Sequence, residues 1–92
     1  MSKAVWKYAL STVDCFEYAV PSEAKVLHIA TQSGYPCMWV EVDPNAQRGE
    51  VRRFRTYGTG HPIDDVEQTY LGTYMVADDA LVFHVYEQKA ER

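Results

Sequence analysis

The stretch that decides the fold is Lys25-Val26-Leu27-His28-Ile29-Ala30-Thr31-Gln32-Ser33-Gly34-Tyr35-Pro36-Cys37-Met38-Trp39-Val40-Glu41-Val42. It holds two runs rich in aliphatic and aromatic residues, which are common in strands. Between them lies a segment with glycine and proline, the residues that reverse a chain. Asp43-Pro44-Asn45 closes the second run. The pattern predicts a β-hairpin with strands over 25–31 and 37–42.

Apolar residues elsewhere in the chain recur with a period of two rather than 3.6, which is typical of strands. Further strands are expected over 5–10, 15–20, 51–57, 69–76 and 80–87. The first two are expected to form another hairpin about a turn at 11–14, and 21–24 is expected to be a turn. Gly72 interrupts its strand, which indicates a bulge or a point of close packing.

These elements predict an all-β fold in which about seven antiparallel strands, connected by hairpins, form a compact sandwich or a partly open barrel. Residues 1–92 are expected to form a single domain, with a flexible tail at 87–92. Aromatic side chains such as Trp39, Phe54 and Phe83 are expected in the core.

Composition excludes several classes of function. The 92-residue chain carries a net charge of -4, which disfavours general nucleic-acid binding because the phosphate backbone is also negative. No apolar run approaches the ~20 residues of a membrane span, and charged residues interrupt the first 20 positions, so no signal peptide is predicted. We therefore expect a cytoplasmic protein without a membrane partner, in which Cys15 and Cys37 are reduced thiols.

A loop with two glycines, Tyr57-Gly58-Thr59-Gly60-His61-Pro62, follows one predicted strand. Its backbone amides could cradle an anion, with Thr59 and His61 adding contacts. No Walker lysine follows, and no helix begins here to contribute its dipole. A structural β-turn, in which the glycines only let the chain reverse, is the favoured interpretation.

Arginines gather just before this loop, in an otherwise acidic chain. Arg53 and Arg55 share a strand face with Tyr57, an arrangement that can hold a phosphate, a nucleotide or an acidic protein surface. The same charges could merely keep an exposed edge strand soluble, and both interpretations stay open. Tyr35 is expected to be exposed at a turn tip. The predicted binding residues are therefore Arg53, Arg55, Tyr57, Gly58, Thr59, Gly60, His61 and Tyr35.

Histidines offer the remaining candidate chemistry. His61 beside Asp64 or Asp65 could form an acid–base pair, but no nucleophile accompanies it and the acidic residues are typical of a solvated turn. His28, His61 and His84 have no metal-ligand spacing, and a histidine within a strand is more often packed, with partners for its ring nitrogens. We expect no catalytic residue, no metal and no cofactor.

Several segments together resemble a family of small uncharacterised proteins from bacteriophages and prophages. The resemblance covers nearly the whole chain and is sharpest at Arg53-Phe54-Arg55-Thr56-Tyr57-Gly58-Thr59-Gly60-His61-Pro62-Ile63, with Leu81-Val82-Phe83-His84-Val85-Tyr86 at its end. The chain departs from the family at Ser22-Glu23, where a residue followed by glycine is common, so the turn there is expected to be built differently. The resemblance implies a phage accessory protein but no particular activity.

The function expected from these observations is that of a non-catalytic, phage-type accessory protein that binds and occludes a host protein, such as a defence component. It would then act in the host cytoplasm, and a homodimer is a natural assembly for so small a domain. The alternative is a sponge for a phosphorylated or nucleotide-like small molecule, held by the glycine loop and the arginine–tyrosine face. A His61-dependent hydrolase is third. Convergence of Arg55 and His61 on a pocket would favour a ligand, and a flat arrangement would favour docking.

Overall fold

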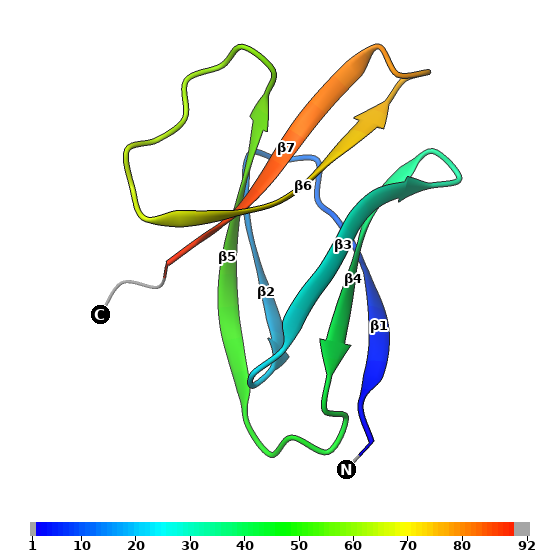
Figure 1. Ribbon diagram of the computed structural model, residues 1–92, viewed down its shortest axis with the longest axis vertical. Coiled ribbons are helices and arrows are strands. Elements are labelled where there is room, and N and C mark those ends of the chain that lie inside the picture. Colours follow the sequence, from blue (N-terminus) through cyan, green and yellow to red (C-terminus); the bar gives the residue numbers. More distant parts are fainter. Residues whose placement is uncertain (1, 90–92) are drawn as a thin grey trace.

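The computed structural model describes residues 2–89 and contains two antiparallel sheets (Figure 1). Its strands are β1 (Ala4–Ala9), β2 (Cys15–Pro21), β3 (Lys25–Gln32), β4 (Tyr35–Val42), β5 (Gly49–Gly58), β6 (Gln68–Val76) and β7 (Leu81–Gln88). Sheet A has the order β1-β4-β3 and sheet B the order β2-β5-β7-β6. All seven predicted strands are confirmed, and no helix occurs between residues 2 and 89.

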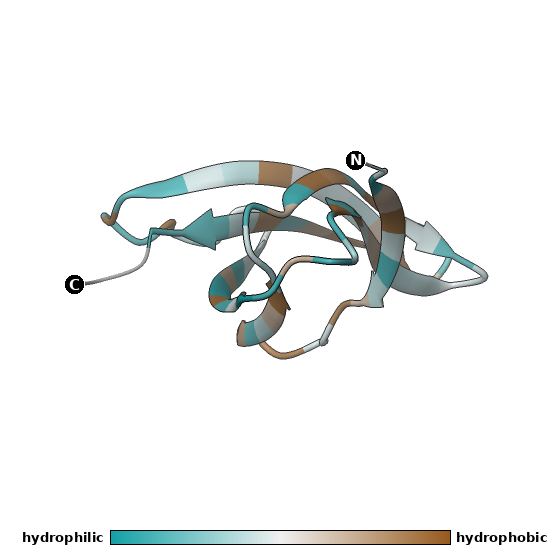
Figure 2. Cartoon of the chain, turned by 90° about the horizontal axis from the view of Figure 1, so that it is seen from below, coloured by the Kyte–Doolittle hydropathy of each residue, from teal (hydrophilic) through white to brown (hydrophobic). Residues whose placement is uncertain are grey.

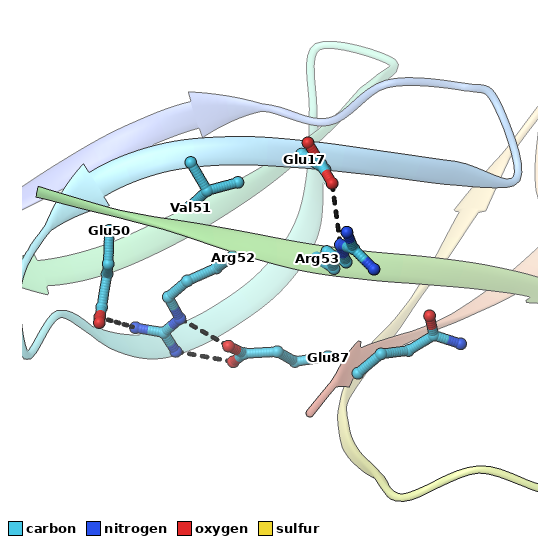
Figure 3. Close-up of a pocket in the computed structure, with 7 residues that line it drawn as sticks. Glu17, Glu50, Val51, Arg52, Arg53 and Glu87 are labelled. Atoms are coloured by element: carbon cyan, nitrogen blue, oxygen red, sulfur yellow. Dashed lines mark hydrogen bonds and ion pairs between the residues drawn. The ribbon is translucent and has the colours of Figure 1, made fainter. Parts of the chain in front are cut away.

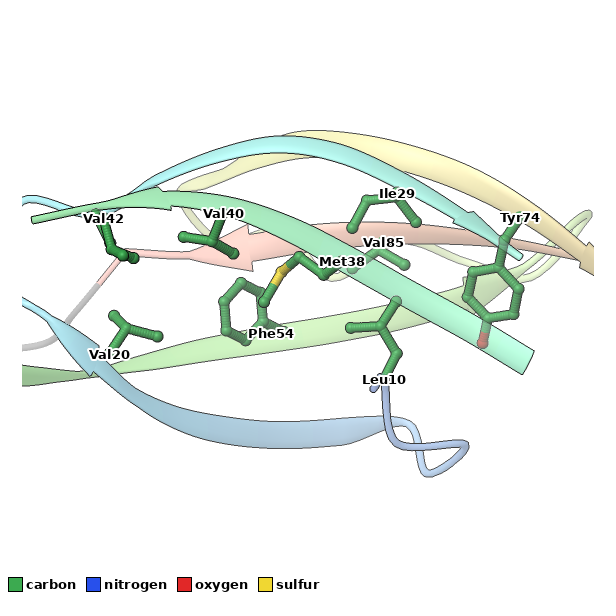
Figure 4. Packing of buried hydrophobic residues seen from close by; sticks show 10 residues of the cluster. Leu10, Val20, Ile29, Met38, Val40, Val42, Phe54, Tyr74 and Val85 are labelled. Carbon is green, nitrogen blue, oxygen red and sulfur yellow. The ribbon is translucent and has the colours of Figure 1, made fainter. Parts of the chain in front are cut away.

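The two sheets stack with their apolar faces together, which makes the fold a sandwich. Figure 2 shows apolar segments alternating with polar ones along the layers. Because alternate side chains of a strand point to opposite faces, each strand can bury one half of its residues. The largest fully buried side chains come from β4, β5 and β7 and meet between the sheets (Figure 4): Met38, Val40, Val42, Phe54 and Val85.

The hairpin predicted for residues 5–20 is wrong. β1 pairs with β4 in sheet A, whereas β2 pairs with β5 in sheet B. The connection between them carries Leu10 into the core, and the Leu10 N–H donates to the carbonyl of Pro36 at 3.0 Å. The chain therefore crosses from one layer to the other instead of reversing within a sheet.

The hairpin over β3 and β4 is confirmed. Ser33 and Gly34 connect the strands with φ values of 52° and 84°. Two consecutive residues with positive φ are typical of the tight turn whose twist matches that of the flanking strands. The hairpin brings Tyr35 to the end of sheet A.

Gly72 is a point of close packing, as the sequence predicts. The register of β6 and β7 shifts between Tyr70 and Gly72, which marks a bulge. A Cβ atom at position 72 would lie 2.6 Å from the Cβ of Ile29, so β6 approaches β3 as closely as a glycine permits. This contact joins one edge strand of each sheet.

Two further expectations need correction. Trp39 is half-buried on the outer face of sheet A rather than in the core, because the inner positions of β4 are the even-numbered ones. Strand β7 continues to Gln88, and the Lys89 N–H donates to the Glu67 carbonyl at 3.0 Å, so the predicted tail does not begin at 87. Residues 90–92 of that tail lie outside the described residues.

Candidate functional site

Tyr57 anchors the connection between β5 and β6. Its hydroxyl lies 3.2 Å from Asp64 Oδ2 and 3.1 Å from Gln68 Oε1, and its ring packs edge-on against Tyr86. The residues between Thr59 and Glu67 thus fold back over the outer face of sheet B. Tyr57 is only 3% exposed, so this predicted binding residue supports the loop from beneath instead of offering its ring to a partner.

The glycine loop is a tight turn, and its backbone conformation favours glycine at position 60. The His61 N–H donates to the Gly58 carbonyl at 3.1 Å, and Gly60 has a φ of 87°. At Gly58 a Cβ atom would lie 3.0 Å from the imidazole of His61, which packs against the glycine. The Thr59 N–H donates to the Val82 carbonyl at 3.3 Å. Two amides that an anion would need are therefore already bonded, which favours the structural interpretation.

His84 lies at the centre of a chain of hydrogen bonds on sheet B. Its Nε2 is 2.8 Å from Thr59 Oγ1, and its Nδ1 is 2.9 Å from Thr73 Oγ1. The hydroxyl of Tyr70 continues the chain to Thr73. Both ring nitrogens are partnered, as expected for a packed histidine. Because a hydroxyl can both donate and accept, these contacts hold the ring in place whichever nitrogen carries the proton.

A shallow pocket of about 290 Å³ opens beside the glycine loop. It is lined by Tyr57, Gly58, Thr59, Gly60, His61, Ile63, His84 and Tyr86. Sequence reasoning missed His84 and Tyr86 as lining residues. The period of two on β7 would have placed them on one face, but it could not show that β7 lies beside β5. Arg55 is not among the lining residues.

Both arginines predicted to bind a partner, Arg53 and Arg55, form contacts with other side chains of the protein. Arg53 Nε donates to Glu17 Oε2 at 2.9 Å. Arg55 Nη1 donates to Cys15 Sγ at 3.1 Å, and its guanidinium lies 5.0 Å from the centre of the Tyr57 ring. Its Nε forms an ion pair with Asp64 Oδ2 at 3.4 Å without an aligned hydrogen bond. The bond to Cys15 is the main reason why the pKa of Arg55 is raised.

A larger hollow, of about 540 Å³, lies at the far end of β5 (Figure 3). Arg52 lines this hollow and forms a bidentate ion pair there: its Nε and Nη2 both donate to the carboxylate of Glu87 at 2.6 Å. Glu50 Oε1 lies 3.6 Å from Arg52 Nη1. The hydrogen bond to Glu87 is the main reason why the pKa of Arg52 is raised. Carboxylates already hold the guanidinium groups here, so the hollow is an ion-pair network rather than an anion site.

Tyr35 and the histidines complete the list of candidates. Tyr35 is 73% exposed at the tip of the β3–β4 hairpin, in a different sheet from the arginines. His28 lies in sheet A, whereas His84 lies in sheet B, so the histidine trio does not assemble. In the part of the chain described, no three potential ligands gather to hold a metal. No carboxylate lies within 4.0 Å of the His61 ring among residues 2–89.

Comparisons with known proteins add a family but no activity. No curated protein and no solved structure shows significant similarity to the chain. Between residues 2 and 89 there is no helix with the length and apolar character needed to cross a membrane. Residues 1–92 match DUF7352, a domain of unknown function, and the chain belongs to that family.

Proposed function

We propose that this protein is a non-catalytic binding protein that docks on another protein and covers a functional surface of it. The observation that carries the proposal is the separation of Arg55 from His61. Arg55 is stacked on Tyr57 and paired with Asp64, while His61 borders a shallow pocket that excludes the guanidinium. Charged groups meant to grip a small phosphorylated ligand would converge on one concave site.

Exposed apolar side chains support docking on a protein. Eleven large hydrophobic residues of the described chain are exposed, among them Val5, Leu27, Tyr35 and Tyr70. Single exposed apolar residues are common on soluble proteins, whereas neighbouring ones mark contact surfaces. Four of the eleven, Val5, Trp6, Leu27 and Tyr35, belong to the three strands of sheet A.

The resemblance to phage and prophage proteins refines the proposal. A phage accessory protein of this size would occlude a host protein, for example a component of a defence system, in the host cytoplasm. The argument from family to role is an analogy, because a fold or family does not by itself fix a function.

A second candidate function rests on the pocket beside the glycine loop. Its walls combine the aromatic Tyr86 with two imidazoles, so a small planar ligand could enter it. In this alternative His61 and His84, rather than the arginines, would contact the ligand.

One experiment separates the two candidates. Tagged protein is incubated with a lysate of cells in which the protein occurs, and captured material is identified by mass spectrometry. Native mass spectrometry of the same purified protein reports a retained small ligand and any homodimer. A stoichiometric protein partner supports docking. If no protein partner is captured, and a small ligand is retained by the wild-type protein but not by His61→Ala, the protein is a ligand binder that uses the pocket and not a docking protein.

A further inference from the structure

The outer face of sheet A is an ordered, uncovered platform. In the register of its strands, Trp39 of β4 lies directly between Lys7 of β1 and His28 of β3. The next row joins Val5, Glu41 and Lys25, and the row on the other side joins Ala9, Cys37 and Ala30. We call these residues, with Leu27 and Tyr35, the sheet A platform.

The centre of the sheet A platform is aromatic, and apolar side chains flank it. The rings of Trp39 and His28 lie 6.0 Å apart. A bulge between Val26 and His28 leaves Leu27 exposed beside them, at 44%, and Val5 is 56% exposed on the opposite edge strand. A tryptophan surrounded by smaller apolar groups is the usual composition of an energetic centre in protein interfaces.

The charges of the sheet A platform oppose those of the whole chain. Two lysines, Lys7 and Lys25, lie on it against a single Glu41, although the chain carries a net charge of -4. Beyond its edge, Lys3 lines a hollow together with Glu23 and Asp43. Lys3 lies 3.9 Å from Glu41. Neither Lys7 nor Lys25 has a carboxylate within 4.0 Å in residues 2–89, and Lys7 Nζ donates to Gln32 Oε1 at 2.8 Å. Elsewhere Arg52, Arg53 and Arg55 are all paired.

We propose that the sheet A platform is the docking surface and that it takes an acidic patch of a partner protein, with Trp39 at the centre of the contact. This inference rests on the proposed function and adds the surface and the chemistry of the partner. Any protein that covers Trp39 also removes water from Lys7, its direct cross-strand neighbour. Burying an ammonium without a counter-charge is costly, so the partner must supply carboxylates.

Other occupants fit the same surface less well. In a two-fold contact with a second copy, the lysines of each platform would face lysines and only one glutamate of the other. A single-stranded nucleic acid would place phosphates near Glu41, and it would leave Val5 and Leu27 without apolar partners. A basic platform on an acidic protein also steers an acidic protein partner toward productive encounters.

Photocrosslinking locates the surface directly. p-Benzoylphenylalanine replaces Val5 or Leu27 on the sheet A platform, or Tyr70 on the outer face of sheet B as the control. Irradiated cells should give one adduct of defined mass from positions 5 and 27 and none from position 70. An adduct from position 70 alone would overturn the platform while leaving the proposed function intact. The absence of any adduct and of any captured protein would overturn both.

Charge reversal tests whether the partner's surface is acidic. The partner identified by cross-linking is purified on its own, and its Kd is measured for each variant. Lys7→Glu and Lys25→Glu should each weaken binding by about tenfold or more, and added salt should weaken the wild-type complex. The matched control is Lys89→Glu. Lys89 is an exposed lysine that follows β7 of sheet B and pairs with Glu67, and its reversal should change the Kd less than about twofold. Circular dichroism checks that each variant is folded. Unchanged binding by both platform variants, an adduct with a second copy, or a nuclease-sensitive adduct would overturn the proposal.

Discussion

Gly72 of β6 faces Ile29 of β3 so closely that a Cβ atom at position 72 would lie 2.6 Å from the Cβ of Ile29. Ile29 is buried in the core and cannot move aside without displacing its neighbours. Gly72→Ala should therefore reduce the free energy of unfolding by about 1–3 kcal/mol through overpacking. Urea denaturation followed by tryptophan fluorescence measures the loss.

Gly58 provides the matched comparison for this prediction. A Cβ atom there would lie 3.0 Å from the ring of His61, which is exposed and can rotate away. Gly58→Ala should cost ~0.5 kcal/mol or less, and nothing in a His61→Ala background. Equal losses from the two glycine variants would show that the contact with Ile29 is not what requires Gly72.

Glu23, in the turn between β2 and β3, has a φ of 63°, a conformation that costs a non-glycine residue about 1–2 kcal/mol. Glu23→Gly should remove this strain. Glycine also raises the conformational entropy of the unfolded chain, which cancels part of the stabilisation. A net stabilisation of roughly 0.5–1 kcal/mol is expected, measured as a higher Tm. Glu23→Ala removes the charge but keeps the Cβ atom; if it stabilises as much as glycine, charge and not backbone strain is the cause.

The Arg52–Glu87 pair should matter far more than the Arg53–Glu17 pair. Arg52 and Glu87 have side chains 17% and 22% exposed, whereas Arg53 and Glu17 are 56% and 53% exposed. Glu87→Gln leaves a largely buried guanidinium without its bidentate partner and should cost about 1–3 kcal/mol. Glu17→Gln should cost less than ~1 kcal/mol because water already solvates that pair. Urea denaturation of both variants measures the loss in the free energy of unfolding, and similar losses would contradict the prediction.

The period of two in the sequence predicts the strands and their faces but not their neighbours. The close packing predicted at Gly72 is confirmed, and the period of two agrees with the shared face on which Phe16 and Val20 pack against the core. Pairing of β1 with β4 is different, because any alternating strand can pair with any other. What separates β1 from β2 is the burial of Leu10 between the layers, and that depends on the assembled core. The outward position of Trp39 is different again: the alternation of Met38, Val40 and Val42 already places Trp39 on the opposite face of its strand, and the expectation of a core tryptophan followed residue type instead.

The candidate site was predictable only in part, for similar reasons. The shared face of Arg55 and Tyr57 follows from their spacing, and the stacking of the guanidinium on the ring agrees with it. The burial of Tyr57 depends on Asp64 and Gln68 folding back over it, which no local pattern in the loop reveals. The paired state of Arg53 likewise depends on Glu17 from a strand whose place in the sheet the sequence leaves open.

Alkaline pH should destabilise the protein through two tyrosines, the buried Tyr74 and the partly buried Tyr18 that packs against the core. Burial raises the pKa of Tyr18 and of Tyr74 above the ordinary value of about 10. Because the folded state holds these protons more tightly than the unfolded state, their contribution is complete below about pH 10 and is lost as the pH rises through the folded pKa. The free energy of unfolding should therefore fall above pH 10, and less steeply in Tyr74→Phe. A slope that this variant leaves unchanged would assign the effect to other groups.

The hydroxyl of Tyr57 should hold the loop between β5 and β6 in place. Its one proton can be donated either to Asp64 Oδ2 or to Gln68 Oε1, and the Asp64 N–H donates back to its oxygen at 3.3 Å. Tyr57→Phe keeps the ring under Arg55 but removes these bonds, so the loss of stability should be about 1 kcal/mol and local in character. Hydrogen exchange should quicken at the Asp64 amide while amides that pair β5 with β7 stay protected. Uniformly faster exchange in both places would mean that the hydroxyl supports the whole sandwich, and unchanged exchange at Asp64 would mean that the ring and the Arg55–Asp64 ion pair suffice to hold the loop.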